Sequence, residues 1–253
     1  MSTAASATSL QREPQLLGQI VVVIGGSAGI GLETARQART EGAKLILTAR
    51  NPEPLERAAS DLDALSSSAF DAEDPVALER FFGDLPSTID HVMVTAGRPT
   101  YGRVIDMDVA QVRQALEGHL LLAIQIARHA AHKVRPGGTL TFIGGTGARR
   151  AAIGNGIAST VTAAFPALTA SLALELAPVR VNLIAAGFVD TPLSAALLGS
   201  QLENRRKQLR ATLPIRRVVG PADVAALAVH IMTNTALTGA TYDIDGGQQL
   251  VAG

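Results

Sequence analysis

Short apolar runs bounded by turn residues alternate along the chain with segments whose apolar residues recur at helical spacing. The runs predict strands at Ile20–Ile24, Lys44–Thr48, Ser68–Phe70, His91–Thr95, Thr139–Ile143, Arg180–Ile184 and Ala240–Ile244. The periodic segments predict helices near Ile30–Glu41, Pro54–Leu65, Pro75–Phe82, Val109–Val134, Ile157–Leu176 and Ala222–Met232. Because strands that alternate with helices form a parallel sheet covered on both faces, we predict a single α/β domain over residues 16–253 with a Rossmann-like, doubly wound sheet. Ligands of such a sheet bind at the carboxyl ends of its strands, where the strand order reverses.

Three segments depart from this alternation. Residues 1–15 are predicted to form a flexible tail. The opening Met1–Ser9 is rich in Ser, Thr and Ala and lacks both the basic start and the apolar stretch of a secretory signal. Residues 191–214 are a long polar excursion between strands, and we predict that they form a substrate lid. Ile157–Leu176 has no charge before Glu175, which predicts a helix buried on all sides and kinked at Pro166. The sheet covers one side of that helix, so we expect a symmetry mate on the other, in a homodimer or homotetramer.

The composition is that of a globular protein, since 47% of the residues are hydrophobic and 17% are charged. The 22 basic residues balance the 22 acidic ones, so no basic field favours nucleic acid or an anionic membrane surface. The long uncharged runs Pro14–Leu32 and Ala151–Leu174 are interrupted by glycine or polar residues and do not predict membrane spans. The lack of cysteine excludes a disulfide framework and a thiolate metal site, so we expect a cytoplasmic protein without a metal.

Glycines mark the junction between the first predicted strand and the first helix, in the segment Ile24–Gly31. Gly25 permits a tight turn, Gly29 lets the backbone approach a pyrophosphate, and Gly31 lets the helix pack on the strand. The helix that starts at Ile30 offers free N–H groups to phosphates. This arrangement predicts a dinucleotide site, and the alternative is a turn that binds nothing.

The end of the second predicted strand favours NADP(H) over NAD(H). An acidic residue there would accept hydrogen bonds from the ribose 2′-OH of NAD, but residues 47–51 contain no acid. Arg50, together with Ser27, can instead bind a 2′-phosphate through charge-assisted hydrogen bonds. The alternative is a solvated arginine in a loop.

Several segments resemble motifs of the short-chain dehydrogenase/reductase family. The glycine turn is similar to that family's TGxxxGIG, and the other matching segments are Val94–Gly97, Arg180–Asn182, Ala186–Pro192 and Asp245–Gly247. The resemblance covers nearly the whole chain and implies a single Rossmann domain, an oxidoreductase activity and an oligomer. It further implies cofactor contacts from Asp71, at the adenine, and from Ala96, Gly97, Gly187, Val189 and Thr191.

The family's catalytic residues are a tyrosine, a lysine four residues later, a serine and an asparagine. Counting back from Ser171–Leu176, which resembles the family's SLALEL, the tyrosine position falls on Ala158 and the lysine position on Thr162. Counting from Gly137, the serine position falls on Gly145. The resemblance therefore implies an active site without its usual catalytic residues.

No change of register restores those residues, because Tyr101 and Tyr242 are the only tyrosines and neither has a lysine four residues later. Four residues near the inferred cleft could act instead. Thr146 lies beside the serine position, Glu117 lies near the asparagine position, and His119 is suited to proton transfer near neutral pH. His119 can equally be a packed residue of an apolar helix, and Glu117 can be a surface charge. The role of Tyr101 is left open.

Arg149 and Arg150 follow the fifth predicted strand at its carboxyl end and could clamp a carboxylate or a phosphate, with Asn155 also facing the substrate. The alternative is a pair of arginines on a solvated loop or at a subunit contact. The sequence thus predicts an NADP(H)-dependent oxidoreductase that acts on a small carbonyl or alcohol by an atypical mechanism. The substrate is anionic if the two arginines face the cleft. A cyclase or isomerase on the same fold, and a catalytically silent NADP-binding subunit or sensor, are the alternatives.

Overall fold

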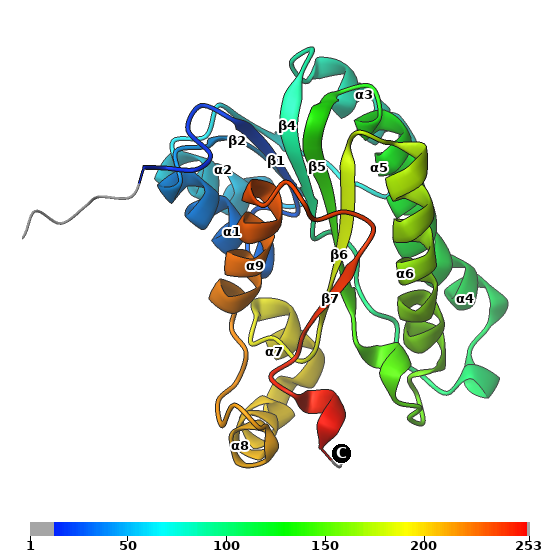
Figure 1. Cartoon of the computed structure of the whole chain (residues 1–253). Helices are drawn as coiled ribbons and strands as arrows, with labels where there is room; N and C mark the ends of the chain where they lie inside the picture. The colour runs from blue at the N-terminus through cyan, green and yellow to red at the C-terminus, as the bar shows by residue number, and fades with distance from the viewer. Residues whose placement is uncertain (1–12, 252–253) are drawn as a thin grey trace, which may run out of the picture.

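The computed structural model describes residues 13–251 and contains a seven-stranded sheet in the order β3-β2-β1-β4-β5-β6-β7 (Figure 1). All paired strands are parallel. The strands are β1 (Ile20–Ile24), β2 (Lys44–Ala49), β3 (Ser66–Ala69), β4 (Ile89–Val94), β5 (Val134–Gly145), β6 (Arg180–Ala186) and β7 (Thr241–Ile244). The order reverses between β1 and β4, which confirms the predicted doubly wound sheet and places its ligand crevice at the carboxyl ends of these two strands.

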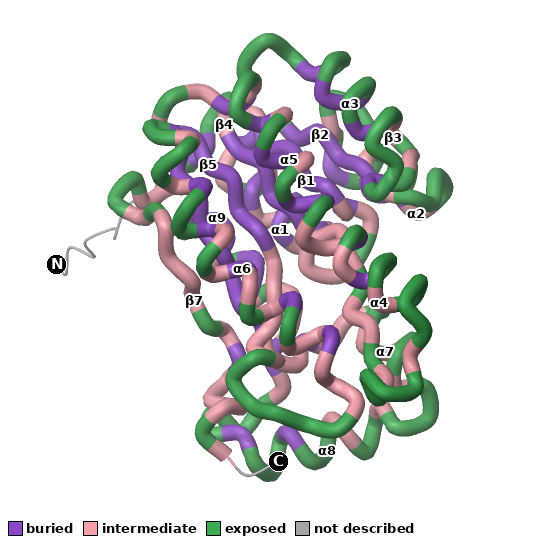
Figure 2. Tube along the Cα trace, turned by 90° about the vertical axis from the view of Figure 1, so that its right-hand side faces the viewer, coloured by how far each residue is buried: buried purple, intermediate pink, exposed green. Residues whose placement is uncertain are grey.

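Helices cover both faces of the sheet. They are α1 (Gly29–Thr40), α2 (Pro52–Asp61), α3 (Pro75–Asp84), α4 (Val109–Leu116), α5 (Leu122–Ala130), α6 (Gly156–Glu175), α7 (Pro192–Leu198), α8 (Leu202–Thr212) and α9 (Pro221–Thr233). Alternate residues of β1 point to opposite faces, so Val21 and Val23 join a core with α1, α2 and α9, while Val22 joins a core with α3, α5 and α6. Figure 2 shows the inner strands β1, β2, β4 and β5 as the buried centre of the molecule, whereas the edge strands β3 and β7 are more exposed.

The predicted helix from Val109 to Val134 is wrong at its end and in its continuity. A π-helical turn, Glu117–Leu121, separates α4 from α5, and α5 ends at Ala130. Val134 instead begins β5, where it pairs with Ile89 of β4. Val134 is apolar and buried, as a residue on the inner face of a helix would be, so periodicity could not locate the boundary.

Helix α6 is not buried on all sides of the single chain, contrary to the expectation from its composition. Phe165 and Leu172 are buried against the sheet, whereas the outer face is exposed and Leu174 has 83% of its surface accessible. The helix continues through Pro166. Among residues 13–251 it is the one helix long and apolar enough to cross a membrane, and its contacts with the sheet are those of a core helix.

Two predicted segments remain, the tail 1–15 and the excursion 191–214. Most of the predicted tail, residues 1–12, lies outside the described residues, but Gln15 donates its backbone N–H to the Glu41 carboxylate (3.0 Å) and Leu16 is fully buried. Gln15 and Leu16, the end of the predicted tail and the start of the predicted domain, are therefore both held against the domain. The excursion 191–214 folds into α7, a 3-10 turn at Gly199–Gln201, and α8.

A buried polar cluster lies at the amino end of the sheet, away from the crevice. The His91 side chain is 1% exposed, with Nδ1 2.9 Å from the Thr139 hydroxyl and Nε2 2.8 Å from Gln19 Oε1. Because an amide oxygen only accepts, Nε2 carries the proton and Nδ1 accepts from Thr139. Burial lowers the pKa of His91 to about 4; the Asp90 carboxylate opposes this shift, while the charges of Arg135 and Arg180 add to it.

Candidate active site

The glycine turn between β1 and α1 has the geometry that a phosphate loop requires. Gly25 has a φ of +98°, in the region that favours glycine. A Cβ on Gly31 would lie 2.2 Å from the Gly25 carbonyl oxygen, so only glycine allows α1 to start this close to the turn. The Thr95 hydroxyl at the end of β4 donates to the carbonyl oxygens of Ile24 and Gly25 (3.1 Å each), which fixes the turn against the crevice.

The N-terminus of α1 is open toward the crevice. Its N-cap residue is Ala28, and no side chain of the described residues caps it. The first N–H groups of α1 are therefore free to bind an anion. A Cβ on Gly29 would meet the Thr191 methyl at 3.4 Å, so the start of the 191–214 segment lies against the turn.

Arg50 and Asp71 lie beyond the carboxyl ends of β2 and β3, on the same edge of the sheet as the turn. Arg50 is exposed and makes no hydrogen bond or ion pair with any residue between 13 and 251. Asp71 is exposed and accepts a hydrogen bond from the Glu73 backbone N–H (3.1 Å). Ser27 is partly buried within the turn. Their positions leave these side chains available to a ligand that extends from the turn across β2 and β3.

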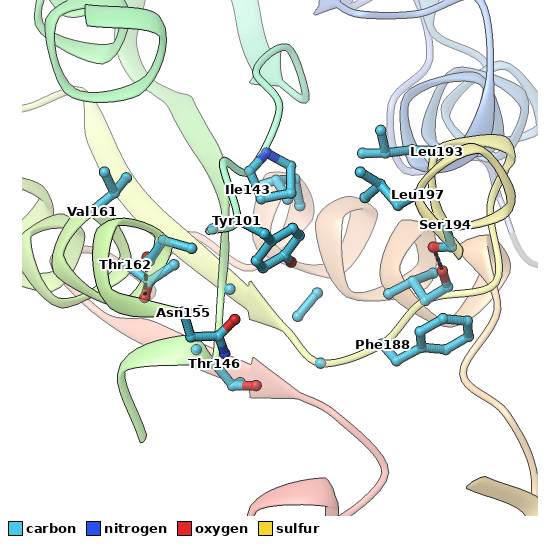
Figure 3. Close-up of a pocket in the computed structure, with 18 of the residues that line it drawn as sticks. Tyr101, Ile143, Thr146, Asn155, Val161, Thr162, Phe188, Leu193, Ser194 and Leu197 are labelled. Atoms are coloured by element: carbon cyan, nitrogen blue, oxygen red, sulfur yellow. Dashed lines mark hydrogen bonds between the residues drawn. The ribbon is translucent and has the colours of Figure 1, made fainter. Parts of the chain in front are cut away.

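A cavity of about 530 Å³ opens at the carboxyl ends of β4, β5 and β6. Its walls are the end of β4, the end of β5, α6, and the segment from Ala186 into α7 and α8 (Figure 3). Of the residues predicted to bind a cofactor, substrate or proton, those that line it are Ile30, Ala96, Gly97, Tyr101, His119, Thr146, Arg149, Arg150, Asn155, Gly187, Val189 and Thr191. The structure thus brings most of the predicted site residues into one cavity, next to the glycine turn.

The three positions at which the resemblance implies the family's serine, tyrosine and lysine lie in this cavity. Gly145, Ala158 and Thr162 all line it, and a Cβ on Gly145 would lie 3.3 Å from the Thr162 methyl. The Thr162 hydroxyl donates to the Ala158 carbonyl (3.0 Å), and the Ser159 hydroxyl donates to the Gly147 carbonyl (2.9 Å). Both hydroxyl protons are therefore used by the backbone.

Tyr101 and His119 are the titratable proton-transfer candidates that reach the cavity. The Tyr101 ring points into the space between α6 and the 188–197 segment (Figure 3), and burial raises the pKa of its phenol. His119 Nδ1 donates to the Ala115 carbonyl (3.1 Å), so Nε2 is the free ring nitrogen, and it lies against Gly97. Burial lowers the pKa of His119, although the hydrogen bond to Ala115 and the charge of Glu73 oppose this shift.

Glu117, which the sequence also offered for proton transfer, does not reach the cavity. It lies in the π-helical turn, is exposed, and is not among the residues that line the cavity. Its neighbour Gly118 is buried instead, because the extra residue of the π turn rotates the helix face. Thr146 and Asn155 do line the cavity, and Figure 3 shows their side chains next to each other.

The two candidate substrate arginines line the cavity but already have partners. Arg149 forms an ion pair with Asp243 at 3.0 Å, and Arg150 donates to the Gln249 carbonyl at 2.8 Å. The sequence did not reveal these contacts, because each joins positions more than ninety residues apart. It also missed Phe188, Leu193 and Arg205, which carry no local motif and reach the cavity only through the fold.

Comparisons with known proteins agree with this geometry. A family model described as enoyl-(acyl carrier protein) reductase matches residues 25–249. The chain is 27% identical over 255 residues to the short-chain dehydrogenase/reductase ATR9 of Stachybotrys chlorohalonatus, covering 92% of this chain and 98% of that protein.

Solved structures are similar over the same length. One is a small-chain dehydrogenase in complex with NADPH (TM-score 0.79, 27% identity, 92% of this chain and 99% of that one). Another is a short-chain dehydrogenase from Burkholderia cenocepacia in complex with NADP (TM-score 0.82, 25% identity, 92% and 98%). The fold and the site define a Rossmann-type oxidoreductase. The chain belongs to the short-chain dehydrogenase/reductase family.

Proposed function

We propose that this protein is an NADP(H)-dependent oxidoreductase that transfers a hydride to or from a small carbonyl or alcohol substrate by an atypical mechanism. The observation that carries the proposal is the position of the cavity, which continues from the glycine turn along the carboxyl edge of the sheet. A nucleotide held on the turn would extend its reactive end into the cavity. Related structures hold NADPH or NADP.

The residues present fit this cofactor. The turn is packed so closely at Gly25 and Gly31 that only glycine fits there, and with the uncapped start of α1 it forms a backbone cradle for a pyrophosphate. Arg50, exposed and without a partner among residues 13–251, would hold the 2′-phosphate, and Asp71 would lie at the adenine. When bound, the cofactor supplies or accepts the hydride.

The proposed active site is degenerate. Gly145, Ala158 and Thr162 provide neither a serine hydroxyl, nor a phenol, nor an ammonium group beside it. A positioned general acid accelerates such a reaction by ~10²–10⁴. Either another residue of the cavity donates the proton, or the reaction is slower by about that factor.

We assign proton transfer to Tyr101 and His119. The phenol of Tyr101 is protonated at neutral pH, as any phenol with a pKa of about 10 or above is, so it can donate a hydrogen bond to a carbonyl oxygen and a proton to the alkoxide that forms. When an alcohol is oxidised the same step runs backwards, so the Tyr101 phenolate would take that proton back. His119 is the alternative group: the lowered pKa keeps its ring neutral, so Nε2 can accept the proton of an alcohol and return it in the reduction. Thr146 and Asn155 would orient the substrate oxygen.

We also propose that the molecule is a cytoplasmic homodimer or homotetramer, with residues 191–214 acting as a lid. The outer face of α6 exposes Leu174 (83%), and Leu121 and Ile124 are also exposed nearby along the chain segment that packs on α6. A second copy would bury this apolar surface.

We predict that Arg50→Ala removes a preference for NADPH over NADH. Charge-assisted hydrogen bonds are worth ~1.5–3 kcal/mol, so the native protein should bind NADPH about 10- to 100-fold more tightly than NADH. The variant should bind both with equal affinity. Calorimetric titration with each cofactor measures this, and Arg39→Ala, at the opposite end of α1 and paired with Asp63, is the matched control.

Equal affinities in the native protein would refute the NADP(H) assignment. The same preparation separates the alternative functions. Oxidation of NADPH during turnover supports the oxidoreductase, turnover without it indicates a cyclase or isomerase, and binding without any turnover indicates a silent subunit or sensor.

A further inference from the structure

The cavity wall carries positive charges that are not balanced within the wall. Its charged residues are Arg149, Arg150 and Arg205, and no aspartate or glutamate of residues 13–251 lines it. Such a lining favours an anionic ligand, since charge-assisted hydrogen bonds are stronger where water is partly excluded. Which arginine can hold the anion depends on the partners that each one already has.

Arg149 and Arg150 are both engaged by the C-terminal segment. Arg149 Nη2 donates to both carboxylate oxygens of Asp243 (3.0 and 3.3 Å), and Arg150 Nη2 donates to the Gln249 carbonyl (2.8 Å). Asp243 neutralises the Arg149 charge. A substrate anion would have to displace a carboxylate of the protein to bind there.

Arg205 differs from them. It lies on α8, is half-buried, and its Nη1 donates to the side-chain oxygen of Gln208 on the same helix (2.7 Å). That oxygen is neutral, and within residues 13–251 no carboxylate pairs with Arg205. Loss of surrounding water lowers the pKa of its guanidinium, as expected for a charge that lacks a counterion.

The acidic residues of α8 and of the loop after β6 form ion pairs with other arginines. Asp190 accepts two hydrogen bonds from Arg206 (2.9 and 2.7 Å), and Glu203 pairs with Arg206 (3.0 Å) and Arg210 (3.5 Å). The two-point contact between Arg206 and Asp190 also fixes α8 to the loop after β6. Arg205, the preceding residue of the helix, is thereby held at the cavity.

We propose that Arg205 determines substrate specificity by binding the carboxylate of an otherwise apolar substrate, an inference that rests on the proposed hydride transfer in the same cavity. Phe188, Leu193 and Leu197 line the cavity on and just before α7 (Figure 3), so the substrate body that lies against them is apolar. The planar guanidinium fork matches the two oxygens of a carboxylate. The substrate class is a keto acid or hydroxy acid with an aliphatic or aromatic body.

Direct binding tests the assignment without turnover. NADPH-loaded protein is titrated calorimetrically with 4-phenylbutyrate and with its neutral analogue 4-phenylbutyramide. The native protein should bind the carboxylate at least about tenfold more tightly. Arg205→Gln should weaken carboxylate binding by at least about tenfold and change amide binding by less than about twofold. Arg210→Gln, on the same helix but outside the cavity lining, is the matched control and should change neither.

Equal binding of the two probes by the native protein would overturn the assignment. A tenfold loss of carboxylate binding in Arg149→Gln or Arg150→Gln, with no such loss in Arg205→Gln, would also overturn it. Weaker NADPH binding by Arg205→Gln would show that this guanidinium contacts a cofactor phosphate, which also overturns it. If the native chain binds no NADPH, that result refutes the proposed function and not the assignment of Arg205. The two probes are then titrated against cofactor-free protein, which still tests Arg205. An unchanged thermal unfolding midpoint verifies that each variant is folded.

Discussion

A variant that combines Gly145→Ser, Ala158→Tyr and Thr162→Lys should reduce neutral activated ketones at least about 10²-fold faster than the native protein, the smallest usual contribution of a general acid. These three positions already line one cavity beside the glycine turn. The double variant Ala158→Tyr with Thr162→Lys should give part of the gain. A serine at 145 requires the change at 162, because its Cβ would lie 3.3 Å from the Thr162 methyl.

Steady-state assays of NADPH oxidation measure this gain, with NADPH affinity as the control for an intact cofactor site. A folded triple variant that binds NADPH but reduces none of the ketones would show that the three positions do not surround the reacting carbon. Fast reduction by the native protein would show that another residue has replaced the tyrosine. Tyr101→Phe and His119→Gln then identify it, since only loss of the true proton donor removes that activity.

The native protein should lose about 3 kcal/mol of stability between pH 6.5 and pH 4 through His91 alone, since one pKa unit corresponds to 1.36 kcal/mol. The folded pKa of His91 is about 4, below the value of about 6.5 that the unfolded chain has. In this pH range the unfolded chain therefore binds more protons than the folded chain does. Stability from this group is fully present above pH 6.5 and is lost as the pH falls toward 4.

Urea unfolding at a series of pH values measures the effect. His91→Gln lacks the titrating ring and keeps an amide that can reach Gln19, so its free energy of unfolding should fall less steeply across this range. His132→Gln, which alters an exposed histidine, is the control and should retain the slope of the native protein. Identical slopes in the native protein and His91→Gln would contradict the prediction.

Part of the cofactor site could be predicted from the sequence because its geometry is local. The turn at Gly25–Gly31 depends on backbone angles and close approaches within seven residues, and glycine is the residue that allows them. The sheet and the helices on its faces followed from the apolar pattern, since each inner strand must bury both faces and each covering helix one. Even here the boundary at Val134 was missed, because a buried strand and a buried helix have similar apolar patterns.

The substrate side could not be predicted in the same way. The sequence placed Arg149 and Arg150 at the cavity, and the structure agrees, but it did not reveal that Asp243 and Gln249 already hold them. Nor did the sequence single out Arg205, because Arg206 and Lys207 follow it directly and no local feature distinguishes the three basic residues.

The sequence by itself therefore determined the fold class and the glycine turn. It also placed an arginine after β2, and Gly145, Ala158 and Thr162 where the resemblance implies the family's catalytic side chains. Tertiary structure alone decided which charges remain unpaired. Ion pairs such as Arg149–Asp243 join residues 94 positions apart, and no local pattern encodes such a distance. The availability of a charged side chain depends on what the folded chain places within about 4 Å of it, and that is set by the packing of whole elements.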